Sequence, residues 1–298
     1  MGLIMNPKIA FFYTAWTDSG EKLITAANKI GVELTPVHYS QLKIEGKKGS
    51  WEILINNRPL KEFSLFYFRS VGDKNEHLPL LLEYAAENKI PVVDEYLNKL
   101  GGAFRKKKST EAMVLLSSRV SYPRSVFVAD REELKKIVEA ENKPVIIKAT
   151  GGRHGKGTFL IQDNQQLAKA LQGRSSLNFL IQEYIPNDGD YRLFLIGYKA
   201  IVGFKRQAKE EKLILDRSIG KSVVLDKIPG AIAEQAQKAA RVLGVEIAGI
   251  DLVIDKRNGM PVVIEVNQAP EFYVMERRTG KDIASLIIKY LKSKTNAS

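Results

Sequence analysis

The sequence contains no cysteine and only three histidines among its 298 residues. The absence of cysteine excludes disulfides, thiolate zinc sites, iron–sulfur clusters and cysteine nucleophiles, and it suits a reducing compartment. The histidines, at positions 38, 77 and 154, are widely separated, so a histidine-rich metal site is not expected. No apolar run approaches the roughly 20 residues that a membrane-spanning helix requires.

Targeting signals and several common catalytic motifs are also missing. The opening MGLIMNPKIAFFY lacks the basic region and cleavage site of a signal peptide, and Asn6 stands where myristoylation prefers Ser or Thr. We therefore expect a soluble, cytoplasmic protein. A GxSxG elbow, an HExxH helix and a dinucleotide-binding GxGxxG after a strand do not occur either. Phosphate binding, metal binding and positive charge are the properties left to explain.

The composition and charge are those of a folded protein with a positive field. Hydrophobic residues make up 44% and charged residues 27% of the chain, as in ordinary globular proteins. The formal net charge is +12, spread along the sequence. Such a field attracts nucleic acids, acidic proteins or nucleotides, and charge alone does not choose among them.

Alternating strand and helix patterns predict an α/β protein of three units. Residues 1–98 form an N-terminal α/β domain, with a strand at 8–14 and a helix that ends at Gly31. Residues 99–182 form a central unit, in which Asp130 is the expected N-cap of a helix. Residues 183–298 form a C-terminal unit, with a hairpin built from AGIDLVID and MPVVIEVN.

This hairpin carries the candidate metal ligands Asp251, Glu265 and Asn267. Side chains alternate along a strand, so Glu265 and Asn267 share one face. Two carboxylates and an amide supply the oxygen ligands that Mg²⁺ takes. The alternative is an antiparallel hairpin with one solvated face and no metal.

The register of the hairpin decides between these interpretations. Asn258-Gly259 is a strong turn signal, and a two-residue loop there would place Asp251 opposite Val266. Glu265 would then point to the other face. A shared metal requires a different register, as in a three-residue loop with Gly259 in the left-handed conformation, or a bulge.

A glycine-rich turn, TGGRHGKG, lies between two predicted strands and includes Gly152, Gly155 and Gly157. It is one residue too short for a P-loop and has glycine where Ser or Thr is needed. Its backbone N–H groups can still bind phosphate, although many such turns are merely hairpin loops. Lys148, in the apolar strand before the turn, either faces solvent or meets an anion.

Three further charged residues suggest anion binding. Asp190 and Arg192 lie on one face of DYRLFLIG, and Arg206 ends the next strand. A guanidinium group binds phosphate or carboxylate through two hydrogen bonds.

Taken in order, these segments resemble the ATP-grasp superfamily, and most closely the RimK-like amino-acid ligases. The resemblance rests on Lys148 before the glycine turn and on LIQEYI, DYRLFLIG, FKRQ, AGIDLVID, VIEVN and TGKDIA, over roughly residues 99–292. It implies an α/β (α+β) ATP-grasp fold with an N-terminal Rossmann-like pre-ATP-grasp domain. It also implies ATP and Mg²⁺ or Mn²⁺, two ions in all, and a homodimer or homotetramer.

The resemblance assigns roles residue by residue. Lys108 and Lys148 match the lysines that contact ATP phosphates, and the glycine-rich turn matches the loop that folds over these phosphates. Glu183, Tyr184 and Ile185 match the segment between the lobes that holds adenine and ribose. Asp190 and Arg192 match the D-x-R motif, with Arg192 and Arg206 at the reacting phosphate. The metal ligands are Asp251, Glu265 and Asn267.

The sequence departs from the family at two places. LILDRSIGKS replaces an Asn and a Gly-Gly pair, and Arg217 is the residue that would substitute. After Asn267, Gln268-Ala269-Pro270-Glu271-Phe272 replaces a Ser-Pro-Gly pattern. That second region borders the acceptor site, so the resemblance does not fix glutamate as the substrate.

The resulting hypothesis is an ATP-dependent carboxylate–amine ligase that works through an acyl phosphate. It would add an amino acid such as glutamate to a protein tail, a peptide or a small molecule. Positioning and charge neutralisation carry such a reaction, which agrees with the lack of a nucleophile motif. The alternative is a basic nucleic-acid- or ribosome-binding protein on an ATP-grasp scaffold, which the net charge of +12 motivates.

Overall fold

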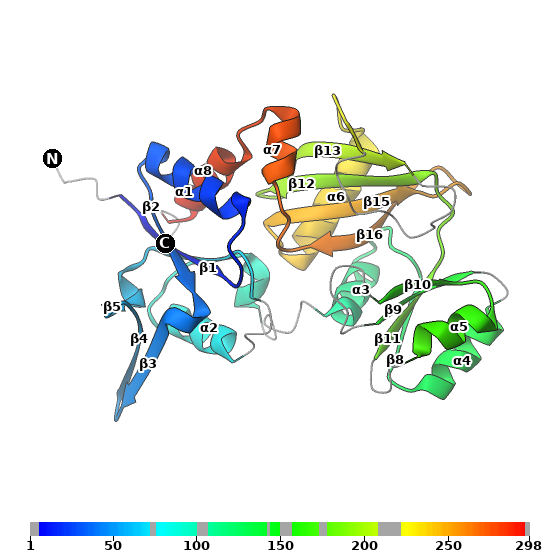
Figure 1. Cartoon of the computed structure of the whole chain (residues 1–298), viewed down its shortest axis with the longest axis horizontal. Helices are drawn as coiled ribbons and strands as arrows, with labels where there is room; N and C mark the ends of the chain where they lie inside the picture. Colours follow the sequence, from blue (N-terminus) through cyan, green and yellow to red (C-terminus); the bar gives the residue numbers. More distant parts are fainter. Residues whose placement is uncertain are drawn as a thin grey trace.

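The computed structural model describes residues 6–71, 76–99, 107–141, 144–149, 157–172, 178–207 and 222–295. The described chain is a mixed α/β protein whose strands form four sheets (Figure 1). Its fold class is the predicted one. None of the described helices combines the length and apolar character needed to cross a bilayer.

The N-terminal region is built on a parallel sheet of order β2-β1-β6-β7. The central strand β1 has the four-residue buried run expected of a strand covered on both faces. Helix α1 ends at Gly31, whose φ of 70° is the left-handed C-cap predicted from the sequence. The elements are β1 (Lys8–Tyr13), α1 (Asp18–Ile30), β2 (Glu33–His38), η1 (Tyr39–Gln41), β6 (Leu65–Phe68), α2 (His77–Glu87), β7 (Val92–Val93) and η3 (Glu95–Asn98).

A small antiparallel sheet of order β3-β4-β5 is attached to this region. Strand β3 was not predicted; all of its residues after Leu42 are exposed, and it is held by pairing with β4. The elements are β3 (Leu42–Lys47), β4 (Ser50–Ile55), β5 (Arg58–Pro59) and η2 (Leu60–Glu62).

The middle of the chain forms an antiparallel sheet of order β10-β9-β11-β8. Asp130 caps helix α4 as predicted, because its Oδ1 accepts a hydrogen bond from Glu133 N at 2.8 Å. The elements are α3 (Lys108–Ser117), β8 (Ser125–Val128), α4 (Arg131–Ala140), β9 (Val145–Ala149), β10 (Thr158–Ile161), α5 (Asn164–Leu171) and β11 (Phe179–Glu183).

The C-terminal region holds a five-stranded antiparallel sheet of order β14-β13-β12-β15-β16. Helix α7 was not predicted; it is only seven residues long and buries only Met275 and Glu276. The elements are β12 (Gly189–Ile196), β13 (Lys199–Gln207), β14 (Ser222–Val224), α6 (Gly230–Leu243), β15 (Ile247–Ile254), β16 (Pro261–Asn267), α7 (Tyr273–Thr279) and α8 (Ile283–Lys294).

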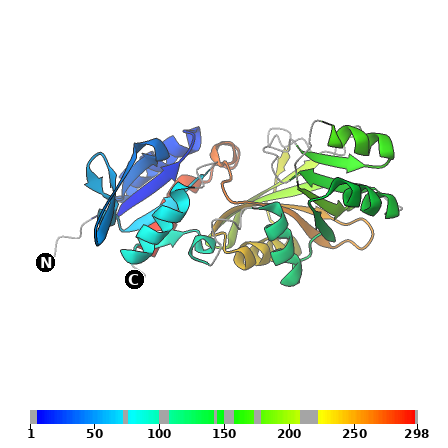
Figure 2. The same ribbon diagram turned by 90° about the horizontal axis from the view of Figure 1, so that it is seen from below.

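The hydrophobic core divides unevenly between these regions. Two large clusters each combine residues of the N-terminal sheet with residues of the C-terminal sheet and its helices. Accordingly α8 lies beside α1, although they come from opposite ends of the chain (Figure 1). A third cluster contains only residues between 126 and 181. The part that it stabilises, β8 to β11 with α4 and α5, is called the central lobe below, and it lies at the far end of the molecule from the N-terminal strands (Figure 2).

Candidate active site

The hairpin of β15 and β16 brings two of the predicted metal ligands face to face. Asp251 pairs directly with Glu265, and Gly249 pairs with Asn267. The register shifts between Asp251 and Leu252, because Ile264 is an extra residue in β16. Gly259 has a φ of 72° in a loop longer than two residues, which Asp255 closes by accepting a hydrogen bond from Gly259 N at 2.7 Å. Of the two alternatives for a shared face, the bulge is the one found, and the three-residue loop is not formed although Gly259 is left-handed. Metal binding itself stays a prediction.

Asp251 lies at the centre of a buried ion network. Its side chain accepts hydrogen bonds from Arg192 Nη1 at 3.0 and 3.1 Å and from Arg206 Nη2 at 3.2 Å. Arg206 also binds Asp190 through Nε at 2.8 Å and through Nη2. These residues come from the adjacent strands β13, β12 and β15, whose pairing sets Arg192 opposite Asp251. The structure thus brings together four residues that the sequence singled out separately.

In the part of the chain that the structure describes, two donor nitrogens of this buried network are left for a ligand. Burial raises the pKa of Asp251 above its ordinary value, although Arg192 and Arg206 act to lower it. Among the described residues, Arg192 Nε and Arg206 Nη1 are buried without a hydrogen-bond acceptor. Leaving such donors unpaired is unfavourable. A phosphate or carboxylate that reached these two guanidinium groups would complete their hydrogen bonding.

Glu111 joins the site and was not predicted from the sequence. It is 8% exposed in the first turn of α3, and its Oε1 accepts a hydrogen bond from Val266 N at 3.2 Å. Burial raises the pKa of Glu111 to about 7, while Lys148 and Lys108 lower it and Glu265 raises it further. A detectable signal existed, since Glu111 lies on the same helical face as the buried Leu115.

Two lysines approach this cluster. Lys148 in β9 donates a hydrogen bond from Nζ to the carbonyl oxygen of Ile264 at 3.0 Å. The bulge residue of the hairpin is thus tied to the central lobe. Lys108 begins α3, one turn before Glu111, and acts electrostatically on that carboxyl. Lys148 therefore approaches the hairpin from the central lobe, and Lys108 approaches Glu111 from helix α3.

The predicted nucleotide-binding segment connects the central lobe to the C-terminal sheet. Glu183 ends β11, Tyr184 is half-buried, and Ile185 packs into a small cluster with Val253 and Val262. Glu183 Oε1 accepts a hydrogen bond from Arg257 Nη1 at 2.5 Å, an interaction that sequence reasoning missed.

Arg257 belongs to the turn of the β15–β16 hairpin and also binds Asp255. Its Nη2 lies 2.6 Å from Asp255 Oδ2, and its Nε lies 2.9 Å from Oδ1. The hydrogen bond to Arg257 lowers the pKa of Asp255, and the two carboxylates raise the pKa of Arg257. The same hairpin that carries the metal-ligand candidates therefore also holds Glu183 in place.

The glycine-rich turn is only partly described. β9 and β10 form the predicted antiparallel hairpin, closed by a 2.7 Å hydrogen bond from Ala149 N to Gly157 O. Gly157 has a φ of 140°, which favours glycine. Gly152 and Gly155 lie outside the described residues, as does Arg217.

The oxygen ligands present fit a hard divalent cation such as Mg²⁺ or Mn²⁺. Asp251 and Glu265 face each other, and Asn267 shares the face of Glu265. Asn267 Oδ1 accepts a 2.9 Å hydrogen bond from Ala269 N, which fixes the amide while one lone pair remains for a ligand. Among the described residues, clusters of three or more His, Asp or Glu side chains with metal-binding geometry do not occur. The predicted set therefore depends on the Asn267 amide as its third ligand.

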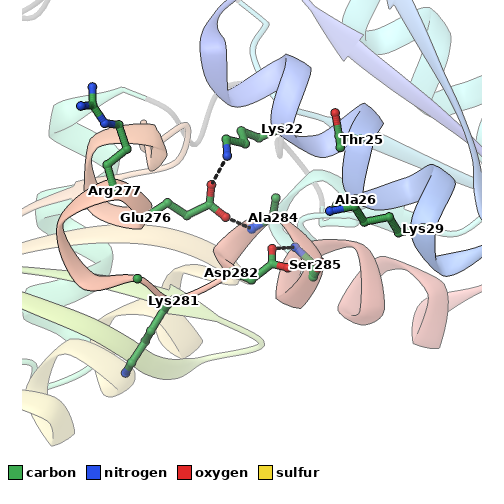
Figure 3. Close-up of a pocket in the computed structure, with 11 residues that line it drawn as sticks. Lys22, Thr25, Ala26, Lys29, Glu276, Arg277, Lys281, Asp282, Ala284 and Ser285 are labelled. Carbon is green, nitrogen blue, oxygen red and sulfur yellow. Dashed lines mark hydrogen bonds and ion pairs between the residues drawn. The ribbon is translucent and has the colours of Figure 1, made fainter.

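A pocket of about 260 Å³ lies between α1, α7 and α8 and is lined by charged residues (Figure 3). Its acidic residues have structural roles. Glu276 accepts a 3.0 Å hydrogen bond from Ala284 N and lies 3.9 Å from Lys22 Nζ. Asp282 accepts a 2.9 Å hydrogen bond from Ser285 N. Both carboxylates cap the first turn of α8, and Glu276 faces α1 across the pocket.

Comparisons with known proteins show the family to which this chain belongs. Residues 105–291 match the model of the RimK-like ATP-grasp domain. The chain is 33% identical over 202 residues to a protein of Stutzerimonas stutzeri named probable alpha-L-glutamate ligase. It is 30% identical over 202 residues to a protein of the same name from Methanococcoides burtonii. Each match covers 66% of this chain and 66% of the relative, so the chain spans just under two thirds of their length.

Solved structures share the fold over almost the whole chain. The ATP-grasp ligase PsnB, complexed with the precursor peptide PsnA2 and AMPPNP, has a TM-score of 0.69 at 17% identity and covers 97% of this chain and 98% of its own. A RimK domain ATP-grasp protein from Sphaerobacter thermophilus has a TM-score of 0.70 at 16% identity and covers 95% and 99%. The fold is thus that of the ATP-grasp proteins, and with the family match the chain belongs to the RimK-like ATP-grasp family.

Proposed function

We propose that this chain is an ATP-dependent carboxylate–amine ligase. The γ-phosphate of ATP would pass to a substrate carboxylate, and an amine would attack the resulting acyl phosphate. The products are an amide, ADP and phosphate. The observation that carries the proposal is the pairing of Asp251 with Glu265 beside two buried arginines, each of which keeps one donor nitrogen without an acceptor among the described residues.

The cationic residues would bind phosphate groups, and the carboxylates and the amide would bind the metal ions. Lys148 in the central lobe and Lys108 at the start of α3 neutralise the phosphates of ATP. Arg192 and Arg206 hold the transferred phosphoryl group and the acyl phosphate through the N–H groups that lack acceptors. Asp251, Glu265 and Asn267 would hold Mg²⁺ or Mn²⁺, as two ions, which supply charge neutralisation at the phosphate oxygens.

Asp190 and Glu183 act as positioning residues. Asp190 is fully buried and orients Arg206 through two hydrogen bonds. Glu183, with Tyr184 and Ile185, lines the position of ribose and adenine between the central lobe and the C-terminal sheet. Phosphoryl transfer of this kind depends on orientation and on electrostatic stabilisation, so a nucleophilic side chain is not required.

The amine substrate we propose is an amino acid, and the carboxylate belongs to a peptide, a protein tail or a small molecule. Two observations support this choice. The relatives are named probable alpha-L-glutamate ligase, and one structural neighbour was solved with a precursor peptide. The formal net charge of +12 is also compatible with an acidic peptide.

The test is a ligation assay with Mg-ATP, single amino acids and acidic peptides. We expect ADP and phosphate in equal amounts with a product whose mass is the sum of the substrates minus water. A carboxylate substrate labelled with ¹⁸O should transfer one labelled oxygen to the phosphate, because the acyl phosphate breaks at its carbonyl carbon. The Asp251→Asn variant is the inactive control.

Two outcomes would count against the proposal. The first is ADP formation without any ligated product across the substrate panel. The second is salt-dependent retention on RNA that is unchanged in Asp251→Asn, without any ligation, because this would favour a nucleic-acid-binding protein.

A further inference from the structure

A second polar cluster lies where the N-terminal sheet meets the C-terminal region. Strand β1 lies between β2 and β6. The chain adds β2 on one side of β1 and β6 on the other, so the order of the strands switches between β1 and β6. In parallel sheets the crevice beyond the carboxyl ends of such strands is where ligands bind. Thr14 and Ser70 follow these two strands, and their hydroxyl oxygens lie 3.0 Å apart. Arg69 comes directly after β6.

The Arg69 guanidinium binds a segment of the C-terminal region. Arg69 is 7% exposed, and its Nη2 donates to Pro270 O and to Glu271 Oε1, both at 2.8 Å. A buried guanidinium group needs a counter-ion. Here Glu271 supplies it, from 202 residues further along the sequence.

The other oxygen of Glu271 is held by the start of α1. Ser19 Oγ donates to Glu271 Oε2 at 2.6 Å, and Thr17 Oγ1 lies 3.3 and 3.4 Å from the two carboxylate oxygens. The N-terminus of this 13-residue helix favours negative charge. Although so many donors hold it, the Glu271 side chain is 57% exposed. The carboxylate is therefore bound in a formed site that remains open to solvent.

This carboxylate site is continuous with the candidate active site. Glu271 follows Asn267 in the segment that departs from the family pattern. Pro270 packs against Gly249, where a Cβ atom would come within 2.9 Å of Pro270 Cβ and 3.3 Å of Arg192 Nη2. Gly249 in turn pairs with Asn267. The short segment 267–271 thus spans from the proposed metal ligands to Arg69.

We propose that Arg69, Ser19 and Thr17 form a carboxylate-binding subsite for a substrate, and that Glu271 occupies this subsite from within the chain. A free dicarboxylate must compete with a carboxylate whose effective concentration is on the order of millimolar. Glu271 therefore sets selectivity against an amino acid that carries a side-chain carboxylate. The inference rests on the proposed ligase function, because it assigns the substrate class of that site.

The test compares the binding of L-glutamate and L-glutamine, which differ mainly in side-chain charge. Titration calorimetry without ATP gives the ratio of the two dissociation constants for the wild type and for Glu271→Ala. We expect Glu271→Ala to shift the ratio toward L-glutamate by about tenfold or more, because Arg69 loses its internal partner. In Glu271→Gln, which can still accept from Arg69, the shift should be smaller.

A matched control and a double variant complete the design. Glu62→Ala removes another exposed glutamate that pairs with an arginine, Arg58, at 2.9 Å, and it should leave the ratio unchanged. Adding Arg69→Lys to Glu271→Ala should abolish most of the gain, since a lysine cannot bind a carboxylate through two parallel hydrogen bonds. Thermal melting identifies a variant that fails to fold. If the variant with Arg69→Lys does not fold, Glu271→Ala alone still tests the subsite, because the Glu271 side chain is exposed.

An unchanged ratio in Glu271→Ala would overturn the inference. So would a gain of the same size in Glu62→Ala. Because binding is measured without ATP, these outcomes are separate from the ligation assay. Absence of ligation in the wild type with every substrate would count against the proposed function, while the Glu271→Ala binding shift would still test the subsite.

Discussion

At the scale of single residues, the balance of charge around Asp251 is the most consequential feature. One carboxylate faces two guanidinium groups, and all three side chains are largely withdrawn from water. The aspartate cannot be lost without leaving buried positive charge. The same residue is also a proposed metal ligand, so structure and chemistry depend on it together.

We predict that Asp251→Asn lowers the rate of ADP formation by roughly a hundredfold or more, because the active site loses an anionic ligand and keeps both arginines. The free energy of unfolding should fall by about 3 kcal/mol, the typical effect of breaking a buried ion pair. Urea denaturation and a coupled ADP assay measure the two effects. The control is Asp188→Asn, whose partner Lys256 is 54% exposed and which should change little. Wild-type ADP formation in Asp251→Asn would contradict the assignment.

The site residues that could be predicted from the sequence are charged residues within otherwise apolar strands. Asp251 and Glu265 stand out as charges in apolar strands, and the need for a shared face correctly required a register other than that of a regular two-residue loop. Glu111 was missed because it lies in the polar first turn of α3, where an acidic residue is ordinary, and only its position on the same face as Leu115 indicated burial. The Arg69–Glu271 pair could not be found, because no local pattern relates residues 202 positions apart.

At the scale of elements, the turn of the β15–β16 hairpin has two tasks. It sets the register that joins Asp251 to Glu265, and through Arg257 it holds Glu183 at the start of the segment between lobes. Lys256 N also donates to Pro186 O at 2.9 Å. The turn is thus bound to that segment by backbone and side chain.

We predict that Arg257→Ala raises KM for ATP roughly five- to twentyfold while kcat changes little, because Glu183 loses the partner that orients it toward the nucleotide. Steady-state kinetics at varied ATP concentration measure this split. Lys256→Ala, which breaks a neighbouring surface ion pair with Asp188, is the matched control and should leave KM for ATP unchanged. An effect on kcat alone would show that Arg257 does not act through nucleotide binding.

Helix α8 offers a prediction about pH. Hydrogen bonds from Ser285 lower the pKa of Asp282 below its ordinary value of 3.8, so the capping carboxylate stabilises the fold above that pH and loses its effect as pH falls through the lowered value. Asp282→Ala should lower the free energy of unfolding by about 1 kcal/mol at pH 7, and the difference should shrink as the pH falls below 3.8 toward the lowered pKa. Urea midpoints between pH 7 and pH 3 test this.

Asp282→Ser is the control for that prediction, because serine keeps the cap hydrogen bond but does not titrate in this range. It should remain near wild-type stability at pH 7. A difference between Asp282→Ala and the wild type that persisted unchanged at low pH would contradict the role of the carboxylate.

Most elements could be predicted because their apolar periodicity and caps agree with their burial. The helix ending at Gly31 and the α4 cap at Asp130 are examples in which the local signal was sufficient. β3 and α7 were missed because their order comes from partners: β3 pairs with β4 along its whole length, and α7 is held by Arg278, whose Nη1 donates to Ser222 Oγ at 2.6 Å. Tertiary contacts decide such segments.

At the scale of the whole molecule, the division of the core indicates which part can move. The N-terminal and C-terminal sheets share two hydrophobic clusters and therefore behave as one body, whereas the central lobe has a core of its own. The hydrogen bond from Lys148 to Ile264 O crosses between them. A nucleotide bound between the two parts would draw the central lobe toward the β15–β16 hairpin.

We therefore predict that Mg²⁺ with a non-hydrolysable ATP analogue slows hydrogen exchange in β9 and β10, which belong to the separate core of the central lobe, more than in the N-terminal strands, which already lie in a shared core. Lys148→Met should weaken nucleotide binding roughly 10- to 100-fold, the loss expected for a charge-assisted hydrogen bond, and should remove this protection. Lys169→Met, on the exposed face of α5 in the same lobe, is the control and should bind and protect like the wild type. Equal protection of all three regions, or full protection in Lys148→Met, would show that the lobe does not close through this lysine.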